Sequence, residues 1–357
     1  MAQTEAAGQA LPVTFSGTTR EYFGIWIVNI LLTVLTLGIY TPWAKVRTMR
    51  YFYGNTQLDN APFDYLASPK AILMGWAIAS LVVIAYSVIT RMMPATAPLF
   101  SIAFVIALPW IIVRAMSFRL RNTAYRNIRF SFDKDYREAV KVFIGMGILV
   151  PITAGLIFPY FAYRQKKFYV DHTAFGQTRF KLPDMALLFY EIYMVVAIVF
   201  LGLVLVLSYL LPTLITPEVQ AAGMNPALGD TSARPFPVGF FSILLAGLLT
   251  AVFSYPYLRA TITNALWNHA SIGGHRFEST LTTHGLMWLY FSNWLAVALS
   301  LGLLTPWTKI RKARYQADNL AMVTSGDLGS FVASKDGKTE SATGEQIGEA
   351  FDVDIGL

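Results

Sequence analysis

Seven long apolar stretches constrain this 357-residue chain more than any other feature of its sequence. Each is about long enough to cross ~30 Å of hydrocarbon as a helix, and none shows the polar face that a half-buried helix presents to water. Only 14% of the residues are charged, which is too few to coat a soluble globule of this size. We therefore expect an all-α integral membrane protein, a polytopic helical bundle. The stretches are 22–43, 71–90, 97–113, 140–163, 186–211, 238–258 and 286–306.

Part of the sequence recurs, and the recurrence suggests internal repeats. The run 38–47 (GIYTPWAKVR) returns as 302–311 (GLLTPWTKIR), and a weaker copy keeps Gly155, Pro159, Tyr160 and Arg164 at the same mutual spacing. We name the segment ending in this run A, and the two apolar stretches after it B and C. The order along the chain is then A, B, C, A, B, C, A.

This pattern predicts a simple domain organisation. An N-terminal cytoplasmic segment, 1–20, precedes a repeat-built membrane domain, 21–324, and an acidic, largely disordered tail, 325–357. The tail should be disordered to about residue 343, and its last stretch, 347–357, either docks on a basic face or only solvates the protein. Within the membrane domain the predicted units are repeat one, 14–117; repeat two, 130–258; and the third A copy, 277–315.

Charge and length disagree about how the A segments meet the membrane. Basic residues flank every A copy, whereas the B–C connections are nearly uncharged. If the A segments are re-entrant, or lie along the surface, all basic stretches face the cytoplasm, as the positive-inside rule requires. If all seven segments cross, the second repeat is inverted, as in many transporters, and its basic flank lies on the opposite side. The length of 22–43 favours a full crossing, so both arrangements stay open.

Aromatic and basic side chains gather where each A segment ends. Amphipathic rings favour the depth of the lipid headgroups, and arginine suits either general cytoplasmic charge or binding to an anionic lipid or substrate. The candidate lipid or substrate contacts are Trp43, Arg47, Arg50, Tyr160, Arg164, Trp307, Arg311 and Arg314.

Three of the polar residues inside the predicted spans are candidates for an intramembrane role. Asn29 and Asn293 hold matching positions, and they either bridge helices or line a polar pathway, because a buried amide needs partners. Glu191 is the only acid well inside a segment, and intramembrane ionisable groups are functional suspects. Its place near the segment end also allows contact with headgroup water.

A resemblance to a known family rests on the run 36–47, followed by Arg50-Tyr51 and Asn55-Thr56. These residues resemble the YjgN family of bacterial inner-membrane proteins. The likeness covers nearly the whole chain, including 307–311 and the late segment 348–354. It implies a multi-pass location in the bacterial cytoplasmic membrane and supplies no activity.

Two hypotheses of function follow. The first is a transporter or channel-like protein for an uncharged or lipid-like solute, because duplicated membrane units commonly enclose a pathway. The alternative is a non-transporting protein that binds anionic lipid or protein partners through its basic cytoplasmic face. The chain has no cysteine and its four histidines do not pair at helical spacing. We therefore expect no metal site. No Gly-rich phosphate loop, nucleophile elbow or pair of carboxylates is present in the sequence, so we expect no cofactor and no catalytic centre. The net charge of +7 in a membrane protein suits cytoplasmic loops and anionic headgroups, so we expect no nucleic-acid partner.

Overall fold

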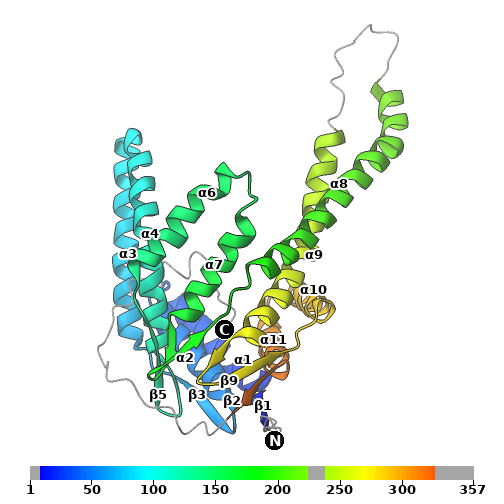
Figure 1. Cartoon of the computed structure of the whole chain (residues 1–357). Helices are drawn as coiled ribbons and strands as arrows, with labels where there is room; N and C mark the ends of the chain where they lie inside the picture. Colours follow the sequence, from blue (N-terminus) through cyan, green and yellow to red (C-terminus); the bar gives the residue numbers. More distant parts are fainter. Residues whose placement is uncertain (1–8, 224–237, 326–357) are drawn as a thin grey trace, which may run out of the picture.

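The chain folds into a closed barrel of antiparallel strands from which helices rise at one end (Figure 1). The computed structural model describes residues 9–223 and 238–325. Within these residues the strand order is β1-β10-β9-β8-β7-β6-β5-β4-β3-β2, so the first and last strands are neighbours. The strands are β1 (Gln9–Phe15), β2 (Thr56–Leu58), β3 (Ala61–Tyr65), β4 (Thr123–Tyr125), β5 (Ile128–Phe132), β6 (Thr173–Phe175), β7 (Thr178–Lys181), β8 (Ser271–Ile272), β9 (His275–Ser279) and β10 (Leu320–Thr324).

Tight turns connect the strands at one end of the barrel and helical hairpins connect them at the other. The turns at Asp59-Asn60, Arg126-Asn127 and Gly273-Gly274 have positive φ at both central residues, the geometry that matches the twist of a two-residue β-hairpin. All helical hairpins therefore leave from the same end. The helices are α1 (Thr19–Leu35), α2 (Thr41–Asn55), α3 (Pro69–Met92), η1 (Pro94–Thr96), α4 (Ala97–Arg121), α5 (Tyr136–Val140), η2 (Lys141–Met146), α6 (Gly147–Ile152), α7 (Phe158–Asp171), α8 (Ala186–Gly223), α9 (Val238–His269), α10 (Thr283–Leu299) and α11 (Thr305–Asp318).

Apolar side chains fill the inside of the barrel. Aromatic rings pack from strand to strand, with centroids 4.9 Å apart for Phe63 and Tyr125 and 6.2 Å apart for Phe180 and Phe277. The Tyr125 hydroxyl donates a 2.8 Å hydrogen bond to the backbone carbonyl of Leu58, which satisfies the polar end of a buried ring. The buried members of this cluster are Leu58, Tyr125, Phe175, Ile272 and Met322. The barrel is a packed core.

Four segments of the described residues are long and apolar enough to cross a membrane: Pro69–Met92, Pro94–Arg121, Ala186–Leu211 and Gly239–His269. They form the two long hairpins, α3–α4 and α8–α9, which Figure 1 shows on either side of α6–α7. Their apolar side chains are mostly exposed. In the most apolar part of each segment, between 0% and 22% of the residues are buried inside the protein. Such surface is stable only in an apolar surrounding.

The expected all-α bundle of seven hydrophobic segments is wrong. The Asn- and Arg-rich stretches between segments form strands that close a barrel, and four segments rather than seven qualify as candidate spans in the described residues. Segments 22–43, 140–163 and 286–306 each contain a chain reversal, so each folds back on itself and forms the far end of a short helical hairpin. The A-B-C repeat scheme is therefore not the unit of this fold. Helix pairs between successive barrel strands organise it instead.

The reversal in the short hairpins has one backbone geometry. Leu37 and Leu301 adopt positive φ of 50°, each followed by a glycine with φ above 90°. The glycine N–H then reaches back to a carbonyl five residues earlier, from Gly38 to Thr33 at 2.8 Å and from Gly302 to Val297 at 2.9 Å. This arrangement ends a helix and satisfies its last carbonyls. Ala154 and Gly155 adopt the same φ signs between α6 and α7.

Candidate functional site

The tips of the short hairpins present strained, exposed leucines. The left-handed conformation costs a non-glycine residue about 1–2 kcal/mol. Even so, Leu37 and Leu301 hold it, and their side chains are 93% and 94% exposed. The strain is the same in water and in lipid, whereas the exposure of these leucines is unfavourable in water. The tips are therefore suited to hydrocarbon, where an exposed leucine is stabilised.

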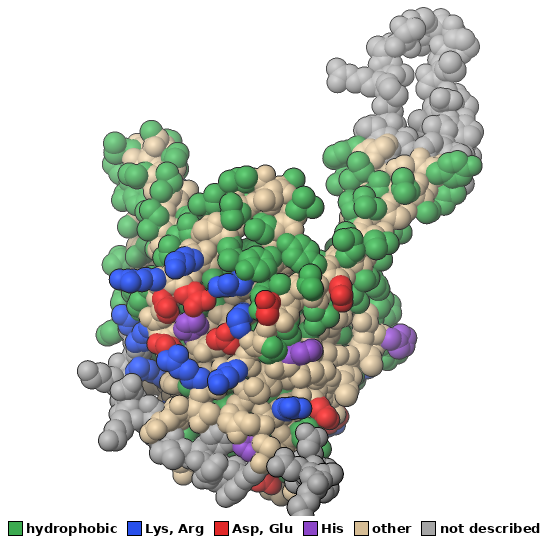
Figure 2. All heavy atoms as spheres, viewed as in Figure 1, with side chains coloured by type: hydrophobic (Ala, Val, Ile, Leu, Met, Phe, Trp, Pro, Cys, Tyr) green, Lys and Arg blue, Asp and Glu red, His purple; other side chains and the backbone are tan. Residues whose placement is uncertain are grey.

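Beneath the apolar hairpins the surface becomes charged. Figure 2 shows hydrophobic side chains covering the upper parts of the hairpins, and lysine, arginine, aspartate and glutamate gathered in a band below them. We call this band of charged side chains the collar. It includes the basic residues of α2, α7 and α11 that are described below. In α2 the transition takes two turns: Tyr40 and Trp43 stack with centroids 6.2 Å apart, and Arg47 follows one turn later. Trp43 is half-buried, whereas Arg47 is exposed and makes no hydrogen bond or ion pair with the described residues.

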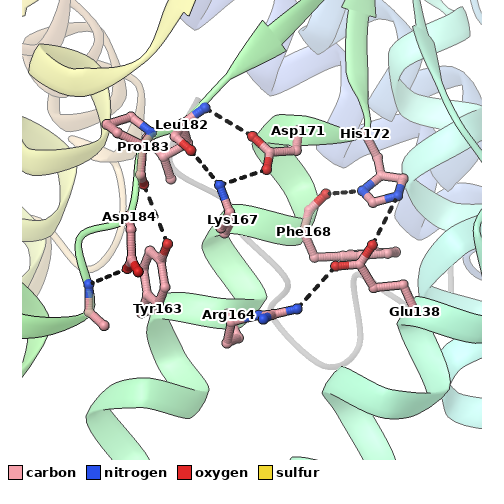
Figure 3. A network of polar contacts seen from close by, with 11 residues as sticks. Glu138, Tyr163, Arg164, Lys167, Phe168, Asp171, His172, Leu182, Pro183 and Asp184 are labelled. Carbon is pink, nitrogen blue, oxygen red and sulfur yellow. Dashed lines mark hydrogen bonds and ion pairs between the residues drawn. The ribbon is translucent and has the colours of Figure 1, made fainter.

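The collar residues of α7 lie in a network of polar contacts (Figure 3). The Arg164 guanidinium lies 3.2 Å from one oxygen of Glu138, and the His172 Nε2 lies 3.5 Å from the other. The ring's Nδ1 faces the Phe168 carbonyl at 2.9 Å. Arg164 is therefore paired within the protein. Tyr160, one turn before it, packs against Tyr163 with ring centroids 6.1 Å apart.

Asp135, Glu138 and His172 place one potential metal-ligand atom each within 4.8 Å of one another. Asp135 caps α5, and the N–H of Glu138 donates to its carboxylate at 2.9 Å, which lowers the pKa of Asp135. The Glu138 oxygens already face Arg164 and His172. These contacts give each member of the group a role in closing the hairpin between β5 and β6, and we assign it no ligand.

A second set of collar cations binds backbone carbonyls where a strand leads into the next helix. Arg50 donates to the carbonyls of Tyr65 and Ala67 at 3.3 and 3.4 Å, and Arg314 donates to that of Gly17 at 3.2 Å. Lys167 donates to the carbonyl of Leu182 and pairs with Asp171 at 2.9 Å. Each cation stands eight residues after the proline that begins its helix, namely Pro42, Pro159 or Pro306. This role was missed from the sequence, although the fixed spacing signalled it.

The remaining predicted residues of α10 and α11 also have partners inside the protein. Arg311 donates to the Ser292 hydroxyl at 2.6 Å and to Asn293 Oδ1 at 3.2 Å, and its guanidinium lies 5.1 Å from the centre of the Trp307 ring. In the first hairpin, the Asn29 amide donates to the Ala44 carbonyl at 3.3 Å. Both asparagines therefore join the two helices of one hairpin.

Glu191 has a different position. It lies in the second turn of α8, and its side chain is exposed. Within the described part of the chain, no hydrogen bond or ion pair joins it to the other predicted site residues. Of the predicted candidates, Arg47 combines exposure, free donors and a neighbouring interfacial aromatic ring most clearly.

The comparisons with known proteins cover nearly all of this architecture. A bacterial family of unknown function, DUF898, matches residues 10–350. The chain belongs to this family. Proteins called inner membrane protein YjgN are similar to it: that of Salmonella typhimurium strain LT2 is 24% identical over 363 residues, covering 91% of each chain. That of Escherichia coli O157:H7 is 29% identical over 148 residues, covering 40% of this chain and 36% of the relative. No solved structure matches.

Membership of the DUF898 family confirms the resemblance read from the sequence. The names of the relatives and the four candidate spans agree on the location, which is the bacterial inner membrane. For this DUF898 chain the candidate spans are the four segments of the α3–α4 and α8–α9 hairpins.

Proposed function

We propose that the protein binds anionic lipid headgroups at its collar while its hairpins anchor it in the inner membrane. The observation that carries the proposal is the position of Arg47. This side chain is exposed, bonds to none of the described residues and follows Trp43 by one helical turn. Arginine with free donors beside an aromatic ring at the headgroup depth suits a phosphate.

The dimensions of the first short hairpin support placing Arg47 at the depth of the lipid headgroups. At 1.5 Å per residue, Arg47 lies ~9 Å along α2 from Thr41, where the helix begins. If Arg47 lies among the headgroups, Leu37 at the apex of this hairpin reaches roughly the middle of a hydrocarbon core ~30 Å thick. The short hairpins would enter one leaflet, and the long hairpins α3–α4 and α8–α9 would cross both. Because the collar and barrel are basic, we place them on the cytoplasmic side.

The proposal is tested by replacing Arg47 with Gln and measuring retained phosphatidylglycerol. A basic residue near an anionic membrane surface is worth ~1 kcal/mol, or about fivefold in affinity. The Arg47→Gln protein should therefore retain several-fold less of this lipid by mass spectrometry after purification. Arg129 is a matched control, since it is an exposed arginine on strand β5 of the barrel. Equal lipid retention by wild type, Arg47→Gln and Arg129→Gln would refute the proposal.

Transport of an uncharged or lipid-like solute stays a prediction. Asn29 and Asn293, for which bridging helices and lining a pathway were the two alternatives, each join two helices of one hairpin. Glu191 is exposed on α8. These contacts favour the lipid-binding alternative. Flux above the empty-vesicle background in proteoliposomes would support transport instead.

A further inference from the structure

A cleft of about 560 Å³ opens on the outer wall of the barrel, away from Arg47 and the short hairpin tips. It lies where β7 and β8 meet the start of the α8 hairpin and the end of α9. Among the described residues, the charged side chains in its lining are Lys181 and Arg276, and none of the lining side chains is acidic. The cleft is therefore electropositive.

The strand register sets the geometry of its floor. Lys181 is directly opposite Ser271, and Ser271 is directly opposite Arg276. Neighbouring strands are ~4.8 Å apart, so the two cations flank a small hydroxyl side chain with Cα atoms roughly 10 Å from each other. Lys181 and Arg276 are exposed, and neither makes a hydrogen bond or ion pair with the described residues. Two uncommitted cations around a small polar residue leave room for a carboxylate.

The same chain supplies a segment of matching charge. Residues 326–357 contain seven acids, Asp327, Asp336, Glu340, Glu345, Glu349, Asp352 and Asp354, against two lysines, Lys335 and Lys338. The described chain enters this segment beside the cleft: the N–H of Ser325 donates to Nδ1 of His275 at 3.2 Å, and His275 precedes Arg276. At up to ~3.3 Å per residue, ten residues of chain span far more than the width of the barrel wall.

We propose that this cleft binds carboxylates of the acidic segment that follows Ser325, within the same molecule. The tether holds the acids at an effective concentration in the millimolar range, so weak surface ion pairs are sufficient for occupancy. The segment would screen Lys181 and Arg276, and leave the collar as the basic surface open to headgroups. The inference uses none of the residues that carry the lipid proposal, so each can fail without the other.

Photo-crosslinking in the full chain tests the proposal. The protein has no cysteine, so Ser341→Cys or Ala350→Cys provides one attachment point for a benzophenone in the acidic segment. The proposal predicts intramolecular crosslinks to the peptides that contain Lys181–Pro183 and Asn268–Arg276. Exposed ion pairs contribute up to ~1 kcal/mol each, so Lys181→Gln with Arg276→Gln should lower the yield by about an order of magnitude. High salt should lower it as well.

Arg129→Gln is the matched control, since it removes one exposed cation from the same wall without touching the cleft. It should leave the yield unchanged. Crosslinks that map elsewhere, join two copies of the chain, or persist in the Lys181→Gln, Arg276→Gln protein would overturn the proposal. Loss of bound phosphatidylglycerol in the double variant, with unchanged crosslinking, would also overturn the proposal. That result would assign the cleft to a lipid headgroup.

Discussion

Arg314 of α11 donates a hydrogen bond to the backbone carbonyl of Gly17, 3.2 Å away across 297 residues of sequence. The bond joins the last helical hairpin to the segment that leads into the first, beside the β1–β10 pair that closes the barrel. Gly17 is buried, so its carbonyl has little access to water as a substitute partner.

Replacing Arg314 with Gln should therefore destabilise the fold by about 1–2 kcal/mol, because a charged donor is lost from a buried carbonyl. The measurement is the free energy of unfolding in detergent. Arg47→Gln, which removes an exposed arginine that has no partner among the described residues, should stay within about 0.5 kcal/mol of wild type. Equal stability of the two variants would contradict a structural role for Arg314.

The hairpin tips give a second prediction. A fluorescent NBD group on Leu37→Cys or Leu301→Cys should emit as in an apolar medium, and nitroxides on lipid chains should quench it. Both side chains are more than 90% exposed among the described residues, so an apolar surrounding for them would have to come from lipid rather than from this part of the protein. The same label on Asp64→Cys, on the exposed face of β3, should emit as in water. Water-like emission at both leucines would exclude insertion of the tips.

A third prediction concerns pH. Burial lowers the pKa of His275 below its usual 6.5, and the neutral ring accepts the Ser325 N–H. Below pH ~6.5 the unfolded chain therefore binds a proton that the folded chain resists, so stability falls as the pH drops from ~6.5 towards the folded pKa. Above ~6.5 this contribution is complete.

Denaturation midpoints between pH 7.5 and 5.5 measure this effect. His275→Asn should show a shallower loss of stability on acidification than wild type, whatever its stability at pH 7.5. His284 is an exposed histidine on α10, so His284→Asn is the control and should keep the wild-type slope. A wild-type slope in His275→Asn would show that His275 does not carry the pH dependence.

Some of the fold follows from local sequence and some does not. The stretches 71–90 and 186–211 are uninterrupted and apolar, and they became candidate spans. The stretch 22–43 is equally apolar, but Leu37 and Gly38 reverse the chain through two residues of positive φ. Gly38 was visible in the sequence, whereas a leucine in the left-handed conformation carries no sequence signal.

The barrel could not be predicted from local pattern. Strands such as β4 and β8 have three and two residues, too short for alternation to be recognised. Their closure depends on β1 and β10, where Gln9 pairs with Thr324 at opposite ends of the described chain. At the site, the predicted basic positions lie on the second helix of each short hairpin, α2, α7 or α11. The sequence did not separate Arg50 and Arg314, which bind backbone carbonyls, from Arg47, which has no hydrogen-bond or ion-pair partner among the described residues.

The sidedness of the barrel tests the central claim most directly. Asp64 follows one predicted apolar segment and Gln177 follows four, so seven full crossings would put them on opposite faces of the membrane. The barrel puts both on one face, because every helical hairpin leaves from the same end. Single cysteines at these positions should react with an impermeant maleimide from the cytoplasmic side alone. Reaction of Asp64→Cys and Gln177→Cys from opposite sides would contradict this structure of the protein in the membrane.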